Sequence, residues 1–86
     1  MSYEVGFKPA ALRQLRKFNK DAQIAILEAI ELLADQPRPQ GCKKLKGDVD
    51  LYRIRVAGDY RVVYAIEDQR LLVTVVKIGH RREVYR

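Results

Sequence analysis

The chain has few of the residues on which most protein chemistry depends. It carries one cysteine, one histidine and no tryptophan in 86 residues. Cys42 has no second cysteine with which to form an internal disulfide, and one histidine with scattered carboxylates gives no metal site. The only serine is Ser2, near the start of the chain, so a serine nucleophile is not expected. The sequence therefore predicts no bound metal and no cofactor.

Long apolar runs are also missing. No stretch of about 18 apolar residues occurs, which argues against a membrane-spanning helix. Glu4 lies where a signal peptide would have uninterrupted apolar length, so we expect no export. The phosphate-binding loop, the dinucleotide fingerprint and the zinc-protease motif are absent. With a hydrophobic fraction of 48%, the composition predicts one folded domain, residues 1–86, that is cytoplasmic and binds no membrane.

Acidic residues are outnumbered by basic ones. Seventeen lysines and arginines stand against eleven aspartates and glutamates, which gives a net charge of +6. Such an excess serves solubility in many proteins, and it also suits a polyanionic partner such as nucleic acid. The positions of the cations favour the second interpretation, because two cationic groups flank a predicted hairpin. They consist of Arg38, Lys43, Lys44 and Lys46 before it, and of Arg81, Arg82 and Arg86 at the end of the chain.

The hairpin is predicted by residues 51–66, LYRIRVAGDYRVVYAI. Side chains alternate across a strand, so the aromatic and branched residues of each strand share one face. These two faces form a common core only if Val56 pairs with Tyr60. The three-residue loop that remains leaves Gly58 or Asp59 with a positive φ.

This register also brings arginines together. Arg55 comes to lie opposite Arg61, with Arg53 two residues further along the same face. Like charges directly across a strand pair are destabilising, so we expect an anion to bind there. Phosphate is the natural candidate for several guanidinium groups.

The other elements follow from apolar periodicity and breaker residues. We expect strands at residues 2–7, 43–46, 51–56, 60–66 and 71–78, and helices at residues 9–18 and 20–34. Pro9 suits a helix start, Asn19 is the expected N-cap of the second helix, and Gly79 the end of the last strand. Residues 71–78 are apolar on both faces, which predicts an interior strand. The fold class is therefore α+β, a single domain with an N-terminal strand and a two-helix hairpin packed on a mostly antiparallel sheet.

The second predicted helix has an unusually wide apolar face. Ile24, Leu27 and Leu32 widen the face beyond what one contact surface needs. The extra width faces the first helix or a second protein, although an entirely intramolecular core is the commoner case.

The cations, together with His80 and Tyr85, are the remaining candidates for chemistry. Such a set suits the phosphorane-like transition state of RNA cleavage, in which the substrate's own 2′-OH attacks the phosphate. Histidine moves protons near neutral pH, and a tyrosine stacks on exposed bases. The alternatives without chemistry are a surface histidine for His80 and a packing residue for Tyr85.

The order strand, two helices and three strands, with the segments KKLKG, YRIRV, GDYRVVY and GHRREVY, resembles the RelE/ParE superfamily of toxins from toxin–antitoxin systems. The resemblance covers Phe7 to Tyr85. It implies a fold like that of small microbial ribonucleases and, for the RelE branch, metal-independent cleavage of mRNA in the ribosomal A site. It also implies three partners: mRNA, the ribosome, and a cognate antitoxin that wraps the toxin and blocks it.

The resemblance also assigns roles by position. Arg61 matches the arginine of the G-x-Y-R motif that clamps the scissile phosphate, and Arg81 matches the arginine after the terminal glycine. Tyr85 matches the near-terminal tyrosine that stacks on the nucleotide or helps deprotonate it. The implied catalytic residues are Arg53, Arg55, Arg61, His80, Arg81 and Tyr85, and the implied RNA-binding residues are Lys43, Lys44, Lys46 and Arg82.

Two departures from the family pattern affect proton transfer. Arg53 stands where well-studied relatives often have lysine, and an arginine is a poor proton acceptor. His80 stands where some relatives have lysine, and it is the candidate donor to the leaving 5′-oxygen.

Two other functions stay open. A ParE-type toxin would poison DNA gyrase, although ParE-type members generally lack the terminal tyrosine with clustered arginines. An inactive module would bind RNA or an antitoxin with steep salt dependence and without toxicity. The antitoxin would bind the wide face of the second helix or an edge of the sheet. The binding mode would be a helix in a groove or a strand added to the sheet.

Overall fold

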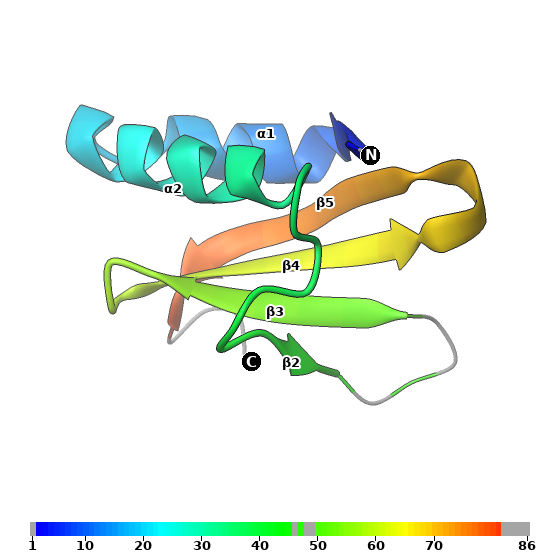
Figure 1. The fold of residues 1–86 in the computed structure, drawn as a ribbon. Coiled ribbons are helices and arrows are strands. Elements are labelled where there is room, and N and C mark those ends of the chain that lie inside the picture. Colours follow the sequence, from blue (N-terminus) through cyan, green and yellow to red (C-terminus); the bar gives the residue numbers. More distant parts are fainter. Residues whose placement is uncertain (1, 46, 48–49, 82–86) are drawn as a thin grey trace.

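Two helices lie side by side across one face of a five-stranded sheet (Figure 1). The computed structural model describes residues 2–45, 47 and 50–81. The elements in chain order are β1 (Glu4–Phe7), α1 (Pro9–Arg16), α2 (Lys20–Leu32), β2 (Lys43–Lys44), β3 (Leu51–Val56), β4 (Tyr60–Glu67), the short 3₁₀ helix η1 (Asp68–Arg70) and β5 (Leu72–His80). The predicted α+β architecture is confirmed.

The strands follow the order β1-β5-β4-β3-β2. Only β1 and β5 pair in parallel, and the other three pairs are antiparallel. The mostly antiparallel sheet and the interior position of β5 are therefore as predicted. The predicted end of β5 at Gly79 is wrong, because Gly79 pairs with Arg61 and His80 pairs with Tyr60. A glycine weakens a strand without being obliged to end it.

Local sequence signals explain the two helices. Pro9 is the first residue of α1, where its missing N–H removes no helical hydrogen bond. Asn19 caps α2, since its side-chain oxygen accepts a hydrogen bond from the Ala22 N–H at 2.8 Å. Asp21 adds a negative charge to the first turn of α2. The prolines of residues 35–41 prevent a longer α2, which ends at Leu32 and not at the predicted Ala34.

The hairpin of β3 and β4 has the predicted register, with Val56 opposite Tyr60 and Arg55 opposite Arg61. Gly58 has the expected positive φ of 76°. Ala57 also has a positive φ, 52°, which the sequence did not predict. A left-handed non-glycine residue costs about 1 kcal/mol or more, so the tight loop is formed against a local preference.

A β-bulge divides β5 into two parts. Tyr64 pairs with Val75 and Val63 pairs with Lys77, so Val76 has no counterpart on β4. Strict alternation would place Lys77 on the core side of the sheet with Val75. The bulge turns Lys77 to the outer side and Ile78 to the core, where Ile78 is 1% exposed.

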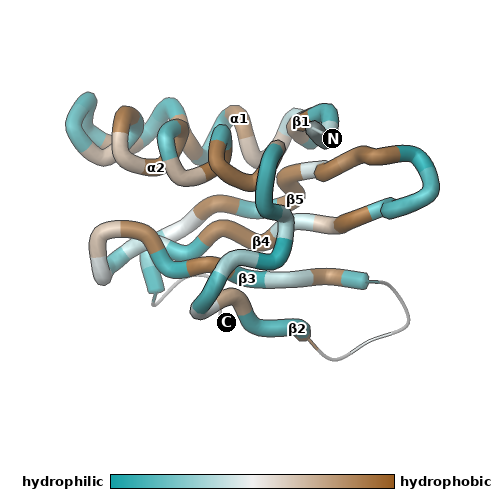
Figure 2. The backbone as a smooth tube through the Cα atoms, viewed as in Figure 1, coloured by the Kyte–Doolittle hydropathy of each residue, from teal (hydrophilic) through white to brown (hydrophobic). Residues whose placement is uncertain are grey.

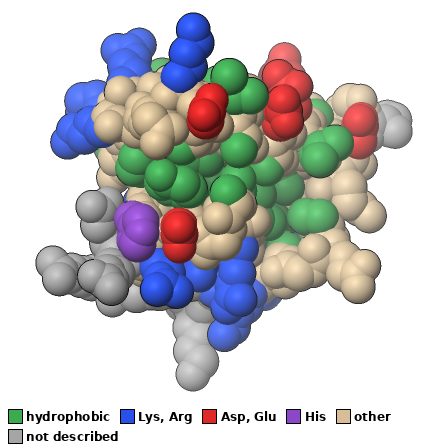
Figure 3. Space-filling model, turned by 90° about the vertical axis from the view of Figure 1, so that its left-hand side faces the viewer, with side chains coloured by type: hydrophobic (Ala, Val, Ile, Leu, Met, Phe, Trp, Pro, Cys, Tyr) green, Lys and Arg blue, Asp and Glu red, His purple; other side chains and the backbone are tan. Residues whose placement is uncertain are grey.

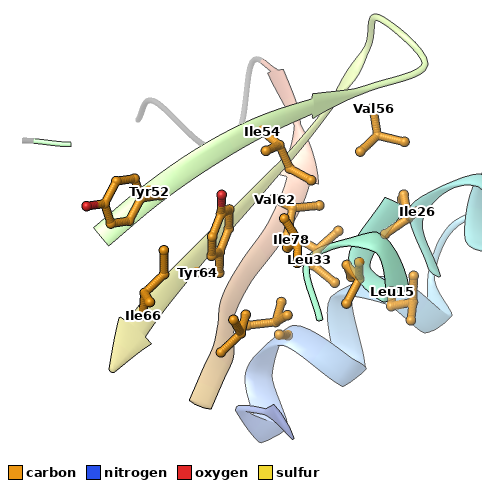
Figure 4. Close-up of a cluster of buried hydrophobic side chains, with 14 residues drawn as sticks. Leu15, Ile26, Leu33, Tyr52, Ile54, Val56, Val62, Tyr64, Ile66 and Ile78 are labelled. Atoms are coloured by element: carbon orange, nitrogen blue, oxygen red, sulfur yellow. The ribbon is translucent and has the colours of Figure 1, made fainter. Parts of the chain in front are cut away.

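The core lies between the helices and the sheet (Figure 4). Side chains of β3, β4 and β5 point toward α1 and α2 and meet apolar side chains of both helices. The labelled members are Leu15, Ile26, Leu33, Tyr52, Ile54, Val56, Val62, Tyr64, Ile66 and Ile78. Along the backbone, the strands and α2 contain hydrophobic stretches, whereas the turn between β4 and β5 is hydrophilic (Figure 2).

A polar cluster, called here the Arg38 cluster, ties four segments of the chain together. The Arg38 guanidinium donates two hydrogen bonds to the Asp68 carboxylate, at 3.1 and 2.8 Å, and the Tyr3 hydroxyl donates to the same carboxylate at 2.6 Å. Arg38 Nε also donates to the Tyr52 hydroxyl oxygen at 3.1 Å. The hydrogen bond from Arg38, followed by that from Tyr3, lowers the pKa of Asp68 to about 2. Arg38 therefore serves the fold, and its partner Tyr52 lies on the core side of the sheet, opposite to the arginines of the hairpin.

The Arg38 cluster predicts a pH-dependent stability. The pKa of Asp68 is about 2 in the folded chain and about 4 in an unfolded one. Ionised Asp68 therefore stabilises the fold above about pH 4, and this contribution is lost as the pH falls from about 4 to about 2. We expect Asp68→Asn to unfold at a lower urea concentration than the wild type at pH 6, with a difference that shrinks through that window.

Urea titrations followed by circular dichroism measure this difference. Glu28→Gln removes an exposed carboxylate outside the cluster and should show no such pH-dependent difference. A difference between Asp68→Asn and wild type that stays constant from pH 6 to pH 2 would contradict the assigned role of Asp68.

Candidate nucleic-acid interface

The sheet face turned away from the helices carries a group of basic side chains, called here the cationic face. Its members are Lys43, Arg53, Arg55, Arg61 and Lys77. Directly paired residues point to the same side of a sheet. A row of such pairs runs across the strands from Lys43 through Arg53 and Val63 to Lys77. Arg55 and Arg61 form a second pair on the same side. Their chain neighbours Tyr52, Ile54, Val62 and Ile78 belong to the core, so the cations lie on the opposite face.

Arg61 is held firmly within this face. Its residue is 7% exposed, and Nη1 donates hydrogen bonds to the carbonyl oxygens of Gly58 at 2.8 Å and Tyr60 at 3.1 Å. Its Nε is buried and has no partner among the residues that the structure describes. A guanidinium has five N–H donors, so the hairpin turn fixes the group and leaves donors for an incoming anion.

Arg55 and Arg53 differ in exposure. Arg55, across the strand pair from Arg61, is exposed, whereas Arg53 is only 7% exposed. The guanidinium groups of the paired residues Arg55 and Arg61 repel each other, at a cost of roughly a few tenths to 1 kcal/mol. An anion bound between them would remove that cost, in agreement with the expectation from the strand register.

Arg81 joins the same end of the sheet from a distant part of the chain. The Arg81 N–H donates to the Asp59 carbonyl oxygen at 2.8 Å, and the residue is exposed. This bond places Arg81 beside the loop that also anchors the Arg61 guanidinium. The structure thus brings Arg55, Arg61 and Arg81 together around one loop.

His80 lies at this end but on the other face. It pairs with Tyr60, which packs against the core, whereas Arg61 on the cationic face pairs with Gly79. The His80 and Tyr60 rings meet edge to face, with centroids 6.1 Å apart. Figure 3 shows the single histidine, in purple, on the same end of the molecule as several basic side chains. His80 therefore belongs to the rim of the cationic face and not to the face itself.

The remaining predicted residues are placed as follows. Lys43 lies on the cationic face opposite Arg53. Lys44 pairs with Tyr52 on the helix side, and its Nζ lies 3.2 Å from an Asp50 carboxylate oxygen. Lys46, Arg82 and Tyr85 lie outside the described residues.

Sequence reasoning missed Lys77. Lys77 is the one cation in the apolar run of residues 71–78. No sequence pattern indicates the bulge that turns it outward. The interruption of that run by Lys77 was the one signal available.

Two hollows border α2, beside the apolar residues that widen its face. A cleft of about 660 Å³ separates α2 from β3, and its lining includes Leu32, Lys43 and Arg55. A second hollow of about 330 Å³ lies between α2 and β1, with Leu27 in its wall. Ile24, Leu27 and Leu32 are exposed in this chain, Leu32 at 67%. The wide face predicted for this helix is therefore open to a partner.

Neither a membrane span nor a metal cluster is found in the described residues. None of the helices there has the length and apolar character to cross a bilayer. The same residues contain no group of three or more histidine, cysteine, aspartate or glutamate side chains placed to hold a metal ion.

Comparison with known proteins relates this arrangement to one family. A family model described as the ParE toxin of the type II toxin–antitoxin system, parDE, matches residues 5–85. The chain is 31% identical to the mRNA interferase toxin RelE of Escherichia coli strain K12 over an alignment of 88 residues, covering 99% of this chain and 92% of that protein. It is 33% identical to the toxin RelE of Mycobacterium tuberculosis over 85 residues, covering 98% and 87% of the two chains.

Solved structures agree with the sequence relatives. RelE in the archaeal RelE–RelB complex of Pyrococcus horikoshii OT3 superposes with a TM-score of 0.83 at 31% identity, covering 96% of this chain and 99% of that one. The isolated RelE toxin of Escherichia coli gives 0.80 at 30% identity, with 98% and 92% covered. The resemblance seen in the sequence motifs is confirmed over nearly the whole chain.

Proposed function

Because the chain belongs to the ParE toxin family of type II toxin–antitoxin systems, we propose that it is a toxin that cleaves mRNA in the ribosomal A site and is blocked by a cognate antitoxin. The observation that carries the proposal is the Arg61 guanidinium, which is anchored to the hairpin loop. Arg55 is its partner across the strand pair, and the Arg81 backbone is bonded to the same loop. This arrangement is a preorganised site for one phosphate.

The reaction needs little covalent chemistry from the protein. The 2′-oxygen of the substrate bonds to the adjacent phosphorus, and the bond from phosphorus to the 5′-oxygen breaks. A proton leaves the 2′-hydroxyl and another reaches the 5′-oxygen, so the products are a 2′,3′-cyclic phosphate and a 5′-hydroxyl. Arg55, Arg61 and Arg81 stabilise the charge that develops on the phosphate oxygens.

Other groups must transfer the protons, because an arginine side chain is not deprotonated in proteins. His80, at the rim beside Tyr60, is the proposed proton donor to the leaving 5′-oxygen. Tyr85 is proposed to stack on the nucleotide or to assist deprotonation of the 2′-hydroxyl, by its match to the family motif.

The experiment is cleavage of mRNA on purified ribosomes, with mapping of the new 5′ ends. We expect cuts at one position within the A-site codon and 5′-hydroxyl ends. Replacing the 2′-OH next to the scissile phosphate by hydrogen should abolish cleavage. Cuts that persist on the 2′-deoxy substrate, or products with 5′-phosphates, would overturn the mechanism.

The reaction is proposed to need no metal at the phosphate. Ribosomes themselves require magnesium, so a chelator is not a usable probe. A sulfur atom in place of a non-bridging oxygen of the scissile phosphate tests the point, since thiophilic Mn²⁺ or Cd²⁺ restores metal-dependent cleavage. We expect slower cleavage that neither ion restores, and restoration by either ion would show a metal in the site.

Inhibition of DNA gyrase is the second candidate, because the matching family model describes ParE toxins. It predicts DNA breaks in cells and unchanged transcripts after induction. An inactive RNA- or antitoxin-binding module predicts neither breaks nor cuts. Induction with and without the antitoxin gene, followed by transcript 5′-end mapping, separates the three.

A further inference from the structure

The sheet face turned away from the helices (Figure 1) is graded in charge along its strands. Directly paired residues form rows across the strands, and successive rows on one face lie two residues apart, about 6–7 Å along a strand. Counted from the hairpin loop, the first and second rows are cationic, the third is uncharged and the fourth is acidic. In that order the rows contain Arg55, Arg61 and Gly79; Lys43, Arg53, Val63 and Lys77; Leu51, Ala65, Thr74 and Gly6; and Glu67, Leu72 and Glu4.

Lys77 belongs to the second row because of the bulge in β5. With Val76 in the chain, strict alternation would place Lys77 on the core side, whereas the bulge places it opposite Val63. Bulges beside functional sites often re-aim one side chain. The same bulge also brings Ile78 into the core, so an uncharged polar residue at position 77 would satisfy the fold. The charge of Lys77 therefore needs another explanation.

The fold gives Lys77 cations as neighbours and no negative partner. Lys77 is half-buried and forms no ion pair with a carboxylate in the part of the chain that the structure describes. Strand pairing places Arg53 beyond Val63 in the same row and Arg61 on the diagonal across β4 and β5. A third cation adds to the repulsion on this face, and an anion bound between these groups would remove it.

We propose that this face binds two successive phosphates of the mRNA, the scissile one in the first row and its neighbour in the second, where Lys77 and Arg53 hold it. The inference rests on the proposed function and extends it from one phosphate to two. The separation of the rows, about 6–7 Å, is comparable with the spacing of successive phosphates in an RNA chain. Arg53 and Lys77 are two strand spacings apart, about 10 Å, which two long side chains bridge around one phosphate.

The third and fourth rows limit the contact to two phosphates. The third row has no charged residue, and the fourth has Glu4 and Glu67. Glu67 pairs with Arg70 at 3.4 Å, whereas Glu4 forms no ion pair within residues 2–45, 47 and 50–81. A third phosphate in the same direction would meet no cation in its row and a carboxylate in the next. The mRNA is therefore expected to leave the face after the second row.

Neutralising single phosphates tests the inference with cleavage switched off. Ribosomes are programmed with mRNA that has the 2′-deoxy substitution at the cleavage position and one uncharged methylphosphonate, placed at the scissile phosphate or one or two phosphates to either side. On mRNA without a methylphosphonate, we expect Lys77→Gln to bind roughly three- to tenfold more weakly than wild type. Its slope of log affinity against log salt should be shallower by roughly 0.7, the value for one contact to a single strand. On mRNA neutralised at one of the two phosphates adjacent to the scissile one, the two proteins should bind equally.

Two further variants control for charge and position. Lys77→Arg keeps the cation and should keep most of the wild-type affinity. Arg70→Gln removes an exposed cation outside the first two rows and should bind every mRNA as the wild type does. Circular dichroism checks the fold of each variant. Saturating Lys77→Gln should cleave unmodified mRNA at nearly the wild-type rate, since a contact made equally before and during the reaction changes affinity and not the chemical step.

Three results would overturn the inference. The first is equal affinity of Lys77→Gln and wild type for mRNA without a methylphosphonate. The second is a difference that persists on every neutralised mRNA, which would show a general effect of charge. The third is a difference that disappears only when the scissile phosphate, or one two positions away, is neutralised. Failure of the proposed function is recognised separately, since wild type would then leave unmodified mRNA uncut on ribosomes.

Discussion

Replacing Arg61 with alanine is expected to reduce the rate of mRNA cleavage on ribosomes by a factor of about 10² to 10³. Loss of one preorganised donor to a developing oxyanion has an effect of that size. Arg61 is the guanidinium that the hairpin loop holds in place, so its donors need no rearrangement when charge builds on the phosphate. Single-turnover cleavage with toxin in excess measures the effect without interference from product release.

Two companion variants make the result interpretable. Arg61→Lys keeps the charge but loses the planar fork, and we expect it to recover only a small part of the rate. Arg70→Ala removes an exposed arginine beyond the far end of β4 and should keep the wild-type rate. Because Arg61 is buried, circular dichroism must show a folded Arg61→Ala protein, and a folded variant that cleaves within about threefold of wild type would refute the phosphate-binding role.

Replacing Ile26 with alanine is expected to lower the free energy of unfolding by about 2–5 kcal/mol. Ile26 is 0% exposed and packs in the core between α2 and the sheet. A domain of this size loses about 4–8 °C in Tm per kcal/mol, so thermal unfolding should shift by roughly 10 °C or more. Such a loss is a large part of the total stability of a small domain.

Ile24 in the same helix provides the matched control. It is 48% exposed, so Ile24→Ala removes the same atoms from a position that leaves no cavity. We expect a change in the free energy of unfolding of less than about 1 kcal/mol. Equal destabilisation by the two variants in thermal unfolding would mean that α2 packs on the sheet through a different face.

The hairpin register was predictable because its two apolar faces can meet in one way only. Pairing Val56 with Tyr60 necessarily places Arg55 opposite Arg61, and the strands β3 and β4 contain both pairs. The interior position of β5 followed from its apolar run in the same manner. Local periodicity and turn chemistry therefore determine this part of the fold.

Other features depend on contacts that are remote in the sequence. Arg38 reaches Asp68, 30 residues away, and nothing near Arg38 in the chain indicates that pairing. The outward direction of Lys77 and the core-side direction of His80 both depend on the bulge in β5. Strand periodicity assumes regular pairing, so it cannot predict which residue a bulge leaves out.

Val76 is an extra residue in β5 that pairs with nothing on β4, and it changes the shape of the strand. A chain lacking it would still align Val75 with Tyr64 and Lys77 with Val63, so every neighbour across β4 would be kept. What would be lost is the local bend and added twist that a bulge introduces. Shortening β5 by this single residue would therefore preserve the pairing while changing the direction in which the backbone leaves the sheet at Arg81.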